Sequence, residues 1–217
     1  MIAVSSVRLN NPESKLSRRK TKEKKMAIEF KGVHHLALVC RDMERTVDFY
    51  TSVLGMELVK GFDLAGGAGQ HFFFDMGGGN LLAFFWFADA TEEVKGVSNA
   101  ANLLGKGSIS SSHGSMNHLA FHAPAEDIER FREEVMAKGI ECSDMINHAD
   151  VLTEPGKSRI TGEVDDTTWV RSFYFLDPDG IMLEFCADIS AGSADISLPV
   201  NADGVKSDGK RLDSVPA

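Results

Sequence analysis

Three residues of metal-binding type stand inside apolar segments of this sequence. His35 opens "HLAL", His118 opens the similar "HLAF", and Glu184 lies in "MLEF". Two neutral imidazoles and a carboxylate suit a borderline divalent ion, and three such ligands leave coordination positions open for substrate and dioxygen. A lone histidine in an apolar strand is more often a core residue, but burying an unpaired carboxylate costs considerable free energy. We therefore treat these three residues as candidate ligands of one metal ion, with packing in the core as the alternative.

Other side chains are candidates for proton transfer or hydrogen bonding beside such an ion. Histidine titrates in the range that suits acid–base catalysis. We rank His71, in "QHFFFD", first, His113 second and His148 third, although each alone could be an ordinary surface or loop residue. Tyr174, in "FYFLD", offers a hydroxyl group, or else is an ordinary strand aromatic.

Three further polar residues near the expected ligands are given other roles. His34 is out of phase with His35 on a strand of period two, so we expect it to be structural. His122 lies one pleat beyond His118 and would at most line a cavity. Arg171 could hold an anionic group of a substrate, although a solvated arginine is the default for such a position.

The elements that must position these residues come in two similar units. The first reads as strand 32–40, helix 41–55, and strands 56–62, 70–76 and 80–87; the second reads as strand 115–123, helix 124–139, and strands 140–146, 169–177 and 180–186. Asp42 is a plausible N-cap of the first helix, and Gly55 and Gly139 are expected to end the two helices. The equal order and near-equal spacing predict an internal duplication of β-α-β-β-β type.

Segments outside the two units are polar and rich in small residues. We divide the chain into a basic leader 1–26, a first module 27–88, a linker loop 89–114, a second module 115–187 and a flexible tail 188–217. A second long polar loop is expected at 147–168. The leader carries most of its charge as Lys and Arg, and three interpretations stay open: a disordered tail, a weak organelle-targeting segment, or residues upstream of a natural start at Met26.

Composition excludes several classes of function. The net charge of −9 makes the chain a poor nucleic-acid binder, and no apolar run reaches the roughly 18 residues that a membrane span needs. Its three widely spaced cysteines do not indicate a disulfide framework, so a reducing, cytoplasmic location is expected.

With two such modules opened by "HLAL" and "HLAF" and closed by "FYFLDPDGIMLEF", residues 31–187 resemble the vicinal oxygen chelate superfamily. That superfamily includes glyoxalase I, fosfomycin-resistance thiol transferases, methylmalonyl-CoA epimerase, bleomycin-binding proteins and extradiol dioxygenases. The resemblance implies an α+β fold in which two tandem βαβββ modules form a cup-shaped mixed β-sheet around a metal site. Carried over by position, the family's ligands fall on His35, His118 and Glu184, and its fourth ligand position falls on Ala83.

A three-ligand set makes glyoxalase I and the epimerase, which use a fourth ligand, less fitting relatives. The closing segment resembles the extradiol signature, which implies that Tyr174 hydrogen-bonds substrate or oxygen. The signature's upstream histidine is missing from "VDDTTWVRS" (164–172), and the position of the family's acid–base histidine falls near Asn80 or Leu81. Another histidine, namely His71, His113 or His148, would have to move protons. The resemblance thus favours an Fe(II) dioxygenase that cleaves the ring of a catechol-like aromatic.

Alternatives to the dioxygenase stay open. One is a metal-dependent lyase, isomerase or thiol transferase using Mn(II), Ni(II) or Zn(II), and the other is a ligand-sequestering binding protein, which retention of the ligands argues against. The expected partner is a small aromatic or vicinal-oxygen substrate, with neither nucleic acid nor membrane. A homodimer is common in the family, but this sequence does not establish one.

Overall fold

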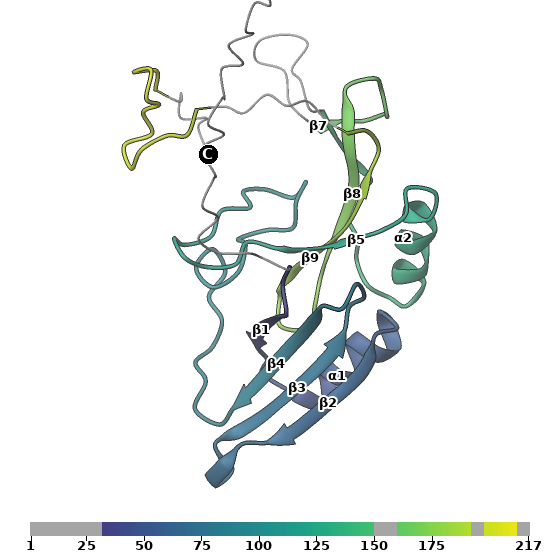
Figure 1. Cartoon of the computed structure of the whole chain (residues 1–217), viewed down its shortest axis with the longest axis vertical. Helices are drawn as coiled ribbons and strands as arrows, with labels where there is room; N and C mark the ends of the chain where they lie inside the picture. Colours follow the sequence, from purple (N-terminus) through teal and green to yellow (C-terminus); the bar gives the residue numbers. More distant parts are fainter. Residues whose placement is uncertain (1–31, 150–159, 192–197, 212–217) are drawn as a thin grey trace, which may run out of the picture. The chain divides into compact units, whose positions relative to one another are not determined.

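The computed structural model describes residues 32–149, 160–191 and 198–211. The first module contains β1 (His35–Val39), α1 (Met43–Asp48), a π-helix (Phe49–Val53), β2 (Glu57–Asp63), a 3-10 turn (Ala65–Gly67), β3 (Gly69–Asp75) and β4 (Leu81–Phe87). The second contains β5 (Leu119–His122), α2 (Ile128–Ala137), β6 (Ile146–Ala149), β7 (Ile160–Thr161), β8 (Thr168–Leu176) and β9 (Met182–Asp188). Figure 1 shows this order of elements.

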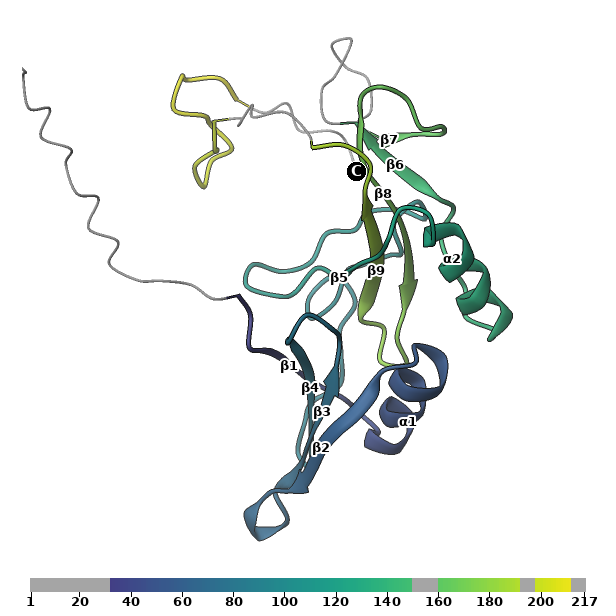
Figure 2. The same ribbon diagram turned by 45° about the vertical axis from the view of Figure 1, so that its right-hand side comes forward.

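Each module forms one mixed sheet. The first has the strand order β1-β4-β3-β2, and the second has the order β5-β9-β8-β6-β7. In both sheets the opening strand runs parallel to the closing strand, and the other pairs are antiparallel. Helix α1 lies against the first sheet and α2 against the second (Figure 2). The predicted α+β fold of two βαβββ modules is therefore confirmed.

The two helices begin and end where the sequence indicates. The Asp42 carboxylate caps α1 by accepting from the backbone N–H of Arg45 at 3.0 Å. Gly55 and Gly139 have φ values of 76° and 83°, which glycine adopts without the steric cost that other residues pay at a helix end. Between α1 and Gly55 the chain continues as the π-helix, which buries Phe49 and Tyr50.

The predicted strand 140–146 is wrong in its position. The structure has only an isolated bridge between Cys142 and Phe175 there, and β6 begins at Ile146. The Ser143 backbone N–H donates to the Tyr174 carbonyl oxygen at 2.8 Å, and the Ser143 hydroxyl oxygen accepts a hydrogen bond from the backbone N–H of Tyr174 at 2.9 Å. This side-chain bond replaces a ladder bond and delays regular pairing. As a result His148, which we assigned to a loop, lies within the sheet.

Specific contacts join the modules. The Tyr50 hydroxyl donates to the Asp177 carboxylate at 3.2 Å, and the backbone N–H of Arg41 donates to Asp179 at 3.0 Å. The Lys138 ammonium, at the end of α2, donates to the carbonyl oxygens of Ser52 and Val53 at 3.0 and 2.6 Å. Lysine thus satisfies carbonyl groups at the end of the π-helix, where a cation is favoured.

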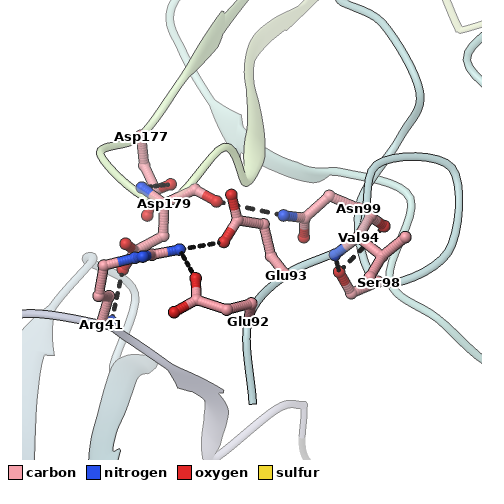
Figure 3. A network of polar contacts seen from close by, with 8 residues as sticks. All are labelled: Arg41, Glu92, Glu93, Val94, Ser98, Asn99, Asp177 and Asp179. Atoms are coloured by element: carbon pink, nitrogen blue, oxygen red, sulfur yellow. Dashed lines mark hydrogen bonds and ion pairs between the residues drawn. The ribbon is translucent and has the colours of Figure 1, made fainter. Parts of the chain in front are cut away.

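The linker loop contacts both modules. Figure 3 shows the Arg41 guanidinium paired with Glu92 and Glu93, and the Asn99 amide donating to the Asp179 carbonyl oxygen. Farther along the loop, Ala100 and Leu103 pack against Ile146, Tyr174 and Met182 of the second module. The loop therefore covers part of one face of the second sheet.

The predicted leader 1–26 lies outside the described residues, and the predicted tail is described only in part. Within that part, bridges join Val200 to Lys206 and Val205 to Arg211. Among the residues that the structure describes, none of the helices has the length and apolar character needed to cross a membrane.

Candidate metal centre

Two of the three predicted ligands meet in the second module. His118 directly precedes β5 and Glu184 lies in β9, the strand that pairs in parallel with β5. The His118 Nε2 atom lies 3.1 Å from a carboxylate oxygen of Glu184, whose side chain is only 6% exposed. A buried carboxylate needs a charged or hydrogen-bonding partner, and here an imidazole supplies it.

The other ring nitrogen of His118 is also engaged. The Nδ1 atom lies 2.8 Å from Oδ1 of Asn117, and the Asn117 amide nitrogen donates to the carbonyl oxygen of Ile109 at 2.6 Å. Because a carbonyl oxygen only accepts, His118 must carry its proton on Nδ1. The Nε2 atom faces the Glu184 carboxylate oxygen, with either a proton or a cation between the two atoms. An imidazole nitrogen and a carboxylate oxygen are donor atoms that a borderline divalent ion accepts, so the residues fit a metal ion.

Further polar side chains surround Glu184. Tyr174 lies opposite Glu184 in the pairing of β8 with β9, and its ring meets the His118 ring edge to face with centroids 5.6 Å apart. Burial raises the pKa of Glu184, but hydrogen bonds from His118, Tyr174 and Ser172 outweigh burial and lower the pKa overall. Glu184 is thus ionised at neutral pH, as a metal ligand must be.

The neighbouring groups remain uncharged at neutral pH. Burial raises the pKa of Tyr174 well above its ordinary value, so its hydroxyl keeps a proton to donate. Burial lowers the pKa of His148, whose Nε2 atom lies 3.1 Å from the Ser172 hydroxyl. Burial also raises the pKa of Cys186 to about 12, which keeps its sulfur a thiol and a poor metal ligand.

The first module repeats this arrangement with different residues. In its sheet Ala37 pairs with Ala83, as Ala120 pairs with Glu184 in the second. The strand registers make four pairs of positions equivalent: His35 with His118, Phe73 with Tyr174, Ala83 with Glu184, and His71 with Ser172. His35 meets Phe73 edge to face at 5.8 Å, much as His118 meets Tyr174. The register thus agrees with the sequence match of Ala83 to Glu184.

His71 lies on the same face of the first sheet as His35. Its ring stacks on Phe85 with centroids 3.6 Å apart and contacts Phe73 at 4.2 Å. The Nε2 atom of His71 is buried and has no hydrogen-bond partner among the described residues. Burial, and then the nearby His35, lower the pKa of His71. The ring is therefore a neutral imidazole at physiological pH, next to one predicted ligand.

The structure does not join the two halves of the predicted site. Within the described part of the chain no three His, Cys, Asp or Glu side chains lie close enough to hold one ion. His35 is exposed, and its Nδ1 atom lies 2.8 Å from Nδ1 of His34. His113 is exposed on the linker loop, and His122 pairs with Asp188 at 3.4 Å. The described residues therefore do not bring His35 together with the His118–Glu184 pair.

Arg171 has a different role from the anion-binding one suggested for it. Its guanidinium pairs with Glu129 of α2 at 2.6 Å. Successive residues of β8 alternate between the two faces of the sheet. Arg171 therefore points toward α2, whereas Ser172 and Tyr174 point toward Glu184. In this structure Arg171 is thus paired within its own module, on the face of the sheet opposite to Glu184.

Three residues of the site were missed or ranked too low: His148, Ser172 and Asn117. Ser172 could have been found, since it is two residues before Tyr174 and shares its face. The contact of His148 depends on where β6 begins, and that of Asn117 depends on the path of the linker loop. Neither contact is marked by a local signal in the sequence.

Comparison with known proteins gives the family. Residues 32–185 match the model of the Glyoxalase/Bleomycin resistance protein/Dioxygenase superfamily. "Uncharacterized protein YwkD" of Bacillus subtilis (strain 168) is 25% identical over 154 residues, which are 71% of this chain and 94% of that protein. "Putative ring-cleaving dioxygenase MhqO" of the same organism is 31% identical over 118 residues, but these are 50% of this chain and only 36% of MhqO.

Solved structures show the same fold. The crystal structure of SMU.1112c is 24% identical, superposes with a TM-score of 0.51, and covers 73% of this chain and 99% of its own. The family model spans both modules and all three predicted ligands. The chain therefore belongs to the Glyoxalase/Bleomycin resistance protein/Dioxygenase superfamily, which is the vicinal oxygen chelate superfamily.

Proposed function

We propose that the protein is an enzyme that holds a divalent ion with His35, His118 and Glu184 and cleaves the ring of a catechol-like aromatic with dioxygen. The observation that carries the proposal is the His118 Nε2 atom lying 3.1 Å from the buried, ionised carboxylate of Glu184. The ion, for which we favour Fe(II), would supply an electrophilic centre with open coordination positions. The likeness to MhqO supports a dioxygenase over a lyase, isomerase or thiol transferase.

The residues of the chain would bind and orient an aromatic substrate. On the first sheet, Phe73 and Phe85 offer an apolar surface beside His35. The neutral His71 can accept a proton from a substrate hydroxyl, and the protonated Tyr174 can donate a hydrogen bond to an oxygen atom on the Glu184 side. Acceptor and donor thus come from opposite modules, so both modules are needed for activity.

We further propose that two copies of the chain complete the site. Each copy presents His35 on an exposed strand of one module and the His118–Glu184 pair on the other, and the described residues of a single copy do not bring the three together. A two-fold dimer would place His35 of each copy against the pair of the other and create two equal sites. The superfamily assignment is consistent with such a homodimer.

Complementation distinguishes a shared site from one made within a chain. His35→Ala and Glu184→Ala chains are expressed separately and together. In a mixed dimer one site would lack both residues, and the other would be intact. Random mixing then restores about a quarter of wild-type sites and activity. Near-zero activity of the co-expressed, folded chains would place all three ligands in one chain.

Oxygen uptake tests the reaction. The full-length protein is purified without air, loaded with Fe(II), and mixed with a panel of substituted catechols, with His118→Ala as the control. The proposal predicts uptake and a yellow ring-cleavage product that the control lacks. Metal binding without uptake would favour the lyase, isomerase or transferase alternative. Tight ligand binding that survives His118→Ala would favour a sequestering protein instead.

The free cysteines support a location in the cytoplasm as part of the proposal. Cys40, Cys142 and Cys186 are all unpaired thiols. Burial raises the pKa of Cys40 and Cys142 to about 11 and of Cys186 to about 12, so none is a reactive thiolate at neutral pH.

A further inference from the structure

The two histidines assigned to the metal share a contact that the repeat does not require. Each has its Nδ1 atom 2.8 Å from a side-chain atom of the residue directly before it: Oδ1 of Asn117 for His118, and Nδ1 of His34 for His35. Adjacent strand residues normally point to opposite faces, so such a contact between neighbours is not a consequence of the strand geometry. It occurs at equivalent positions of two modules that differ in sequence.

We infer that Asn117 and His34 are positioning residues that hold the ligand histidines by Nδ1 and so present Nε2 of each to the metal. The inference rests on the proposed metal site and concerns the hydrogen bonds that hold its ligand histidines in place. A histidine that binds a metal through one ring nitrogen usually donates from the other, and this bond fixes the tautomer and the direction of the ring. Asn117 and His34 themselves would touch neither metal nor substrate.

The Asn117 contact has one direction only. The Asn117 amide nitrogen faces the Ile109 carbonyl oxygen at 2.6 Å, with the Ser111 hydroxyl at 3.5 Å. This leaves Oδ1 toward His118, so the imidazole must donate from Nδ1. Ile109 packs against the hydrophobic cluster that includes Leu103 and Tyr174, so this part of the linker loop sets the orientation of the Asn117 amide. The linker loop would therefore tune the metal site from outside it.

The His34 contact can be made in two directions. If His35 donates, its Nε2 is free to bind the ion; if His34 donates, Nδ1 of His35 accepts and Nε2 carries the proton. Metal binding selects the first arrangement. His34 is exposed, whereas Asn117 is half-buried and anchored. We accordingly expect a smaller effect at His34 than at Asn117.

Metal affinity tests the inference without any turnover. The full chain is titrated with Zn(II) alone in competition with a chelator. We expect Asn117→Leu to weaken binding about 10- to 100-fold, and Asn117→Asp, which keeps the acceptor oxygen toward His118 but loses the amide donor to Ile109, to weaken it less. Asn102→Ala is the matched control, since Asn102 also donates to a linker carbonyl oxygen, that of Ser108 at 2.9 Å, without touching His118. It should leave affinity unchanged.

The possible failures are distinguishable. If Glu184→Gln leaves affinity unchanged, the proposed metal site itself is wrong. If Glu184→Gln weakens Zn(II) binding but Asn117→Leu does not, the positioning role is overturned. It is also overturned if Asn117→Asp or Asn102→Ala weakens Zn(II) binding as much as Asn117→Leu does. At His34, weakening by His34→Ala but not by His34→Asn supports the first-module half, and equal affinity of His34→Ala and wild type overturns it.

A second measurement uses the wild-type protein, so it does not depend on whether any variant folds. Nitrogen-15 NMR of the histidine side chains in the Zn(II)-loaded wild type reports which ring nitrogen carries the proton. We expect a proton on Nδ1 of His118 that exchanges slowly with water, and coordination through Nε2. Coordination of the ion through Nδ1 of His118 would overturn the inference.

Discussion

At the scale of single residues, His71 shows how neighbouring side chains determine the pKa of a histidine. It is a buried imidazole among Phe62, Phe73 and Phe85, with its Nε2 atom unpartnered among the described residues. Burial disfavours the charged form, and the nearby His35 adds to this, so the pKa of His71 is lowered. A cation held by His35 would lower it further. A low pKa makes His71 a base that is ready at neutral pH.

The pH profile of catalysis reports on this base. We expect the acidic limb of kcat/KM to have its midpoint below 6.5, because activity needs neutral His71. His71→Asn should remove that limb and lower kcat by about 10²- to 10⁴-fold. His113→Asn tests the second candidate and should change neither, since His113 is exposed on the linker loop. An unchanged limb in His71→Asn would exclude His71 as the base.

Tyr174 gives a second prediction at this scale. Tyr174→Phe removes only the hydroxyl group, which hydrogen-bonds Glu184, and keeps the ring against His118. We expect kcat/KM to fall by about 10²-fold, as for loss of a catalytic hydrogen bond, while Zn(II) affinity stays within about threefold. A parallel loss of metal affinity and turnover would show that Tyr174 only supports Glu184.

Residue identities in the site were predictable to the extent that they repeat. The equivalence of His35 and His118 was predictable because the two modules carry them at matching positions, and the strand registers confirm that match. His148 was ranked last and Asn117 was overlooked. Their contacts depend on the position of β6 and on the path of the linker loop, which a pattern of period two does not encode.

At the scale of elements, β3 and β4 hold the face that carries His71. Gly69 begins β3, opposite Phe87 of β4. A Cβ atom at Gly69 would lie 1.9 Å from the Trp86 carbonyl oxygen, far inside van der Waals contact. Only glycine lets the two backbones approach this closely, so Gly69 fixes the pairing two residues before His71.

Exchange of this glycine should disrupt the sheet. We expect Gly69→Ala to lower the free energy of unfolding by about 2 kcal/mol or more, measured by urea denaturation. Gly162→Ala is the matched control, since its Cβ would meet nothing within 4 Å, and it should stay within about 0.5 kcal/mol of wild type. Equal stability of the two variants would mean that β3 shifts to accept the side chain.

Element order and type could be predicted from the sequence, whereas one strand position could not. Asp42, Gly55 and Gly139 are local signals, and the structure uses each as expected. The strand after α2 depends instead on Ser143, whose hydroxyl bonds the backbone of a strand 31 residues away. Propensity does not reveal which serine will do this, because the bond forms only when the two segments are already adjacent.

At the scale of the whole molecule, Asp177 lies where the second module meets the first. Its carboxylate accepts from the Tyr50 hydroxyl at 3.2 Å and from the backbone N–H groups of Asp179 and Ile181 at 2.9 and 2.8 Å. Burial raises the pKa of Asp177 from 3.8 to about 6 despite these hydrogen bonds. The junction therefore contains a carboxylate that binds its proton more tightly than an ordinary aspartate does.

Stability should depend on pH through this group. Above about pH 6 Asp177 is ionised in both the folded and unfolded states, and its burial cost is fully present; the folded state binds its proton first as the pH falls toward 4. The contribution of Asp177 to the free energy of unfolding thus rises by about 2 kcal/mol from pH 7 to pH 4.

Replacing the carboxylate isolates this contribution from all others. Asp177→Asn keeps an oxygen for the two backbone N–H groups and lacks the titration. We expect the free energy of unfolding of Asp177→Asn, taken relative to that of wild type, to be higher at pH 7 than at pH 4. This difference between the two proteins should change most between pH 4 and pH 6. Chemical denaturation of both proteins across that range measures it. A difference independent of pH would show that Asp177 titrates normally.

The most direct test of the account is anomalous diffraction at the iron edge from crystals of the Fe(II)-loaded protein. We predict one peak per chain within coordination distance of His118 Nε2 and a Glu184 oxygen, with His35 Nε2 of a second copy as the third protein ligand. A peak that lies away from Glu184, or a protein that holds no iron, would contradict the claim that these residues form a metal centre.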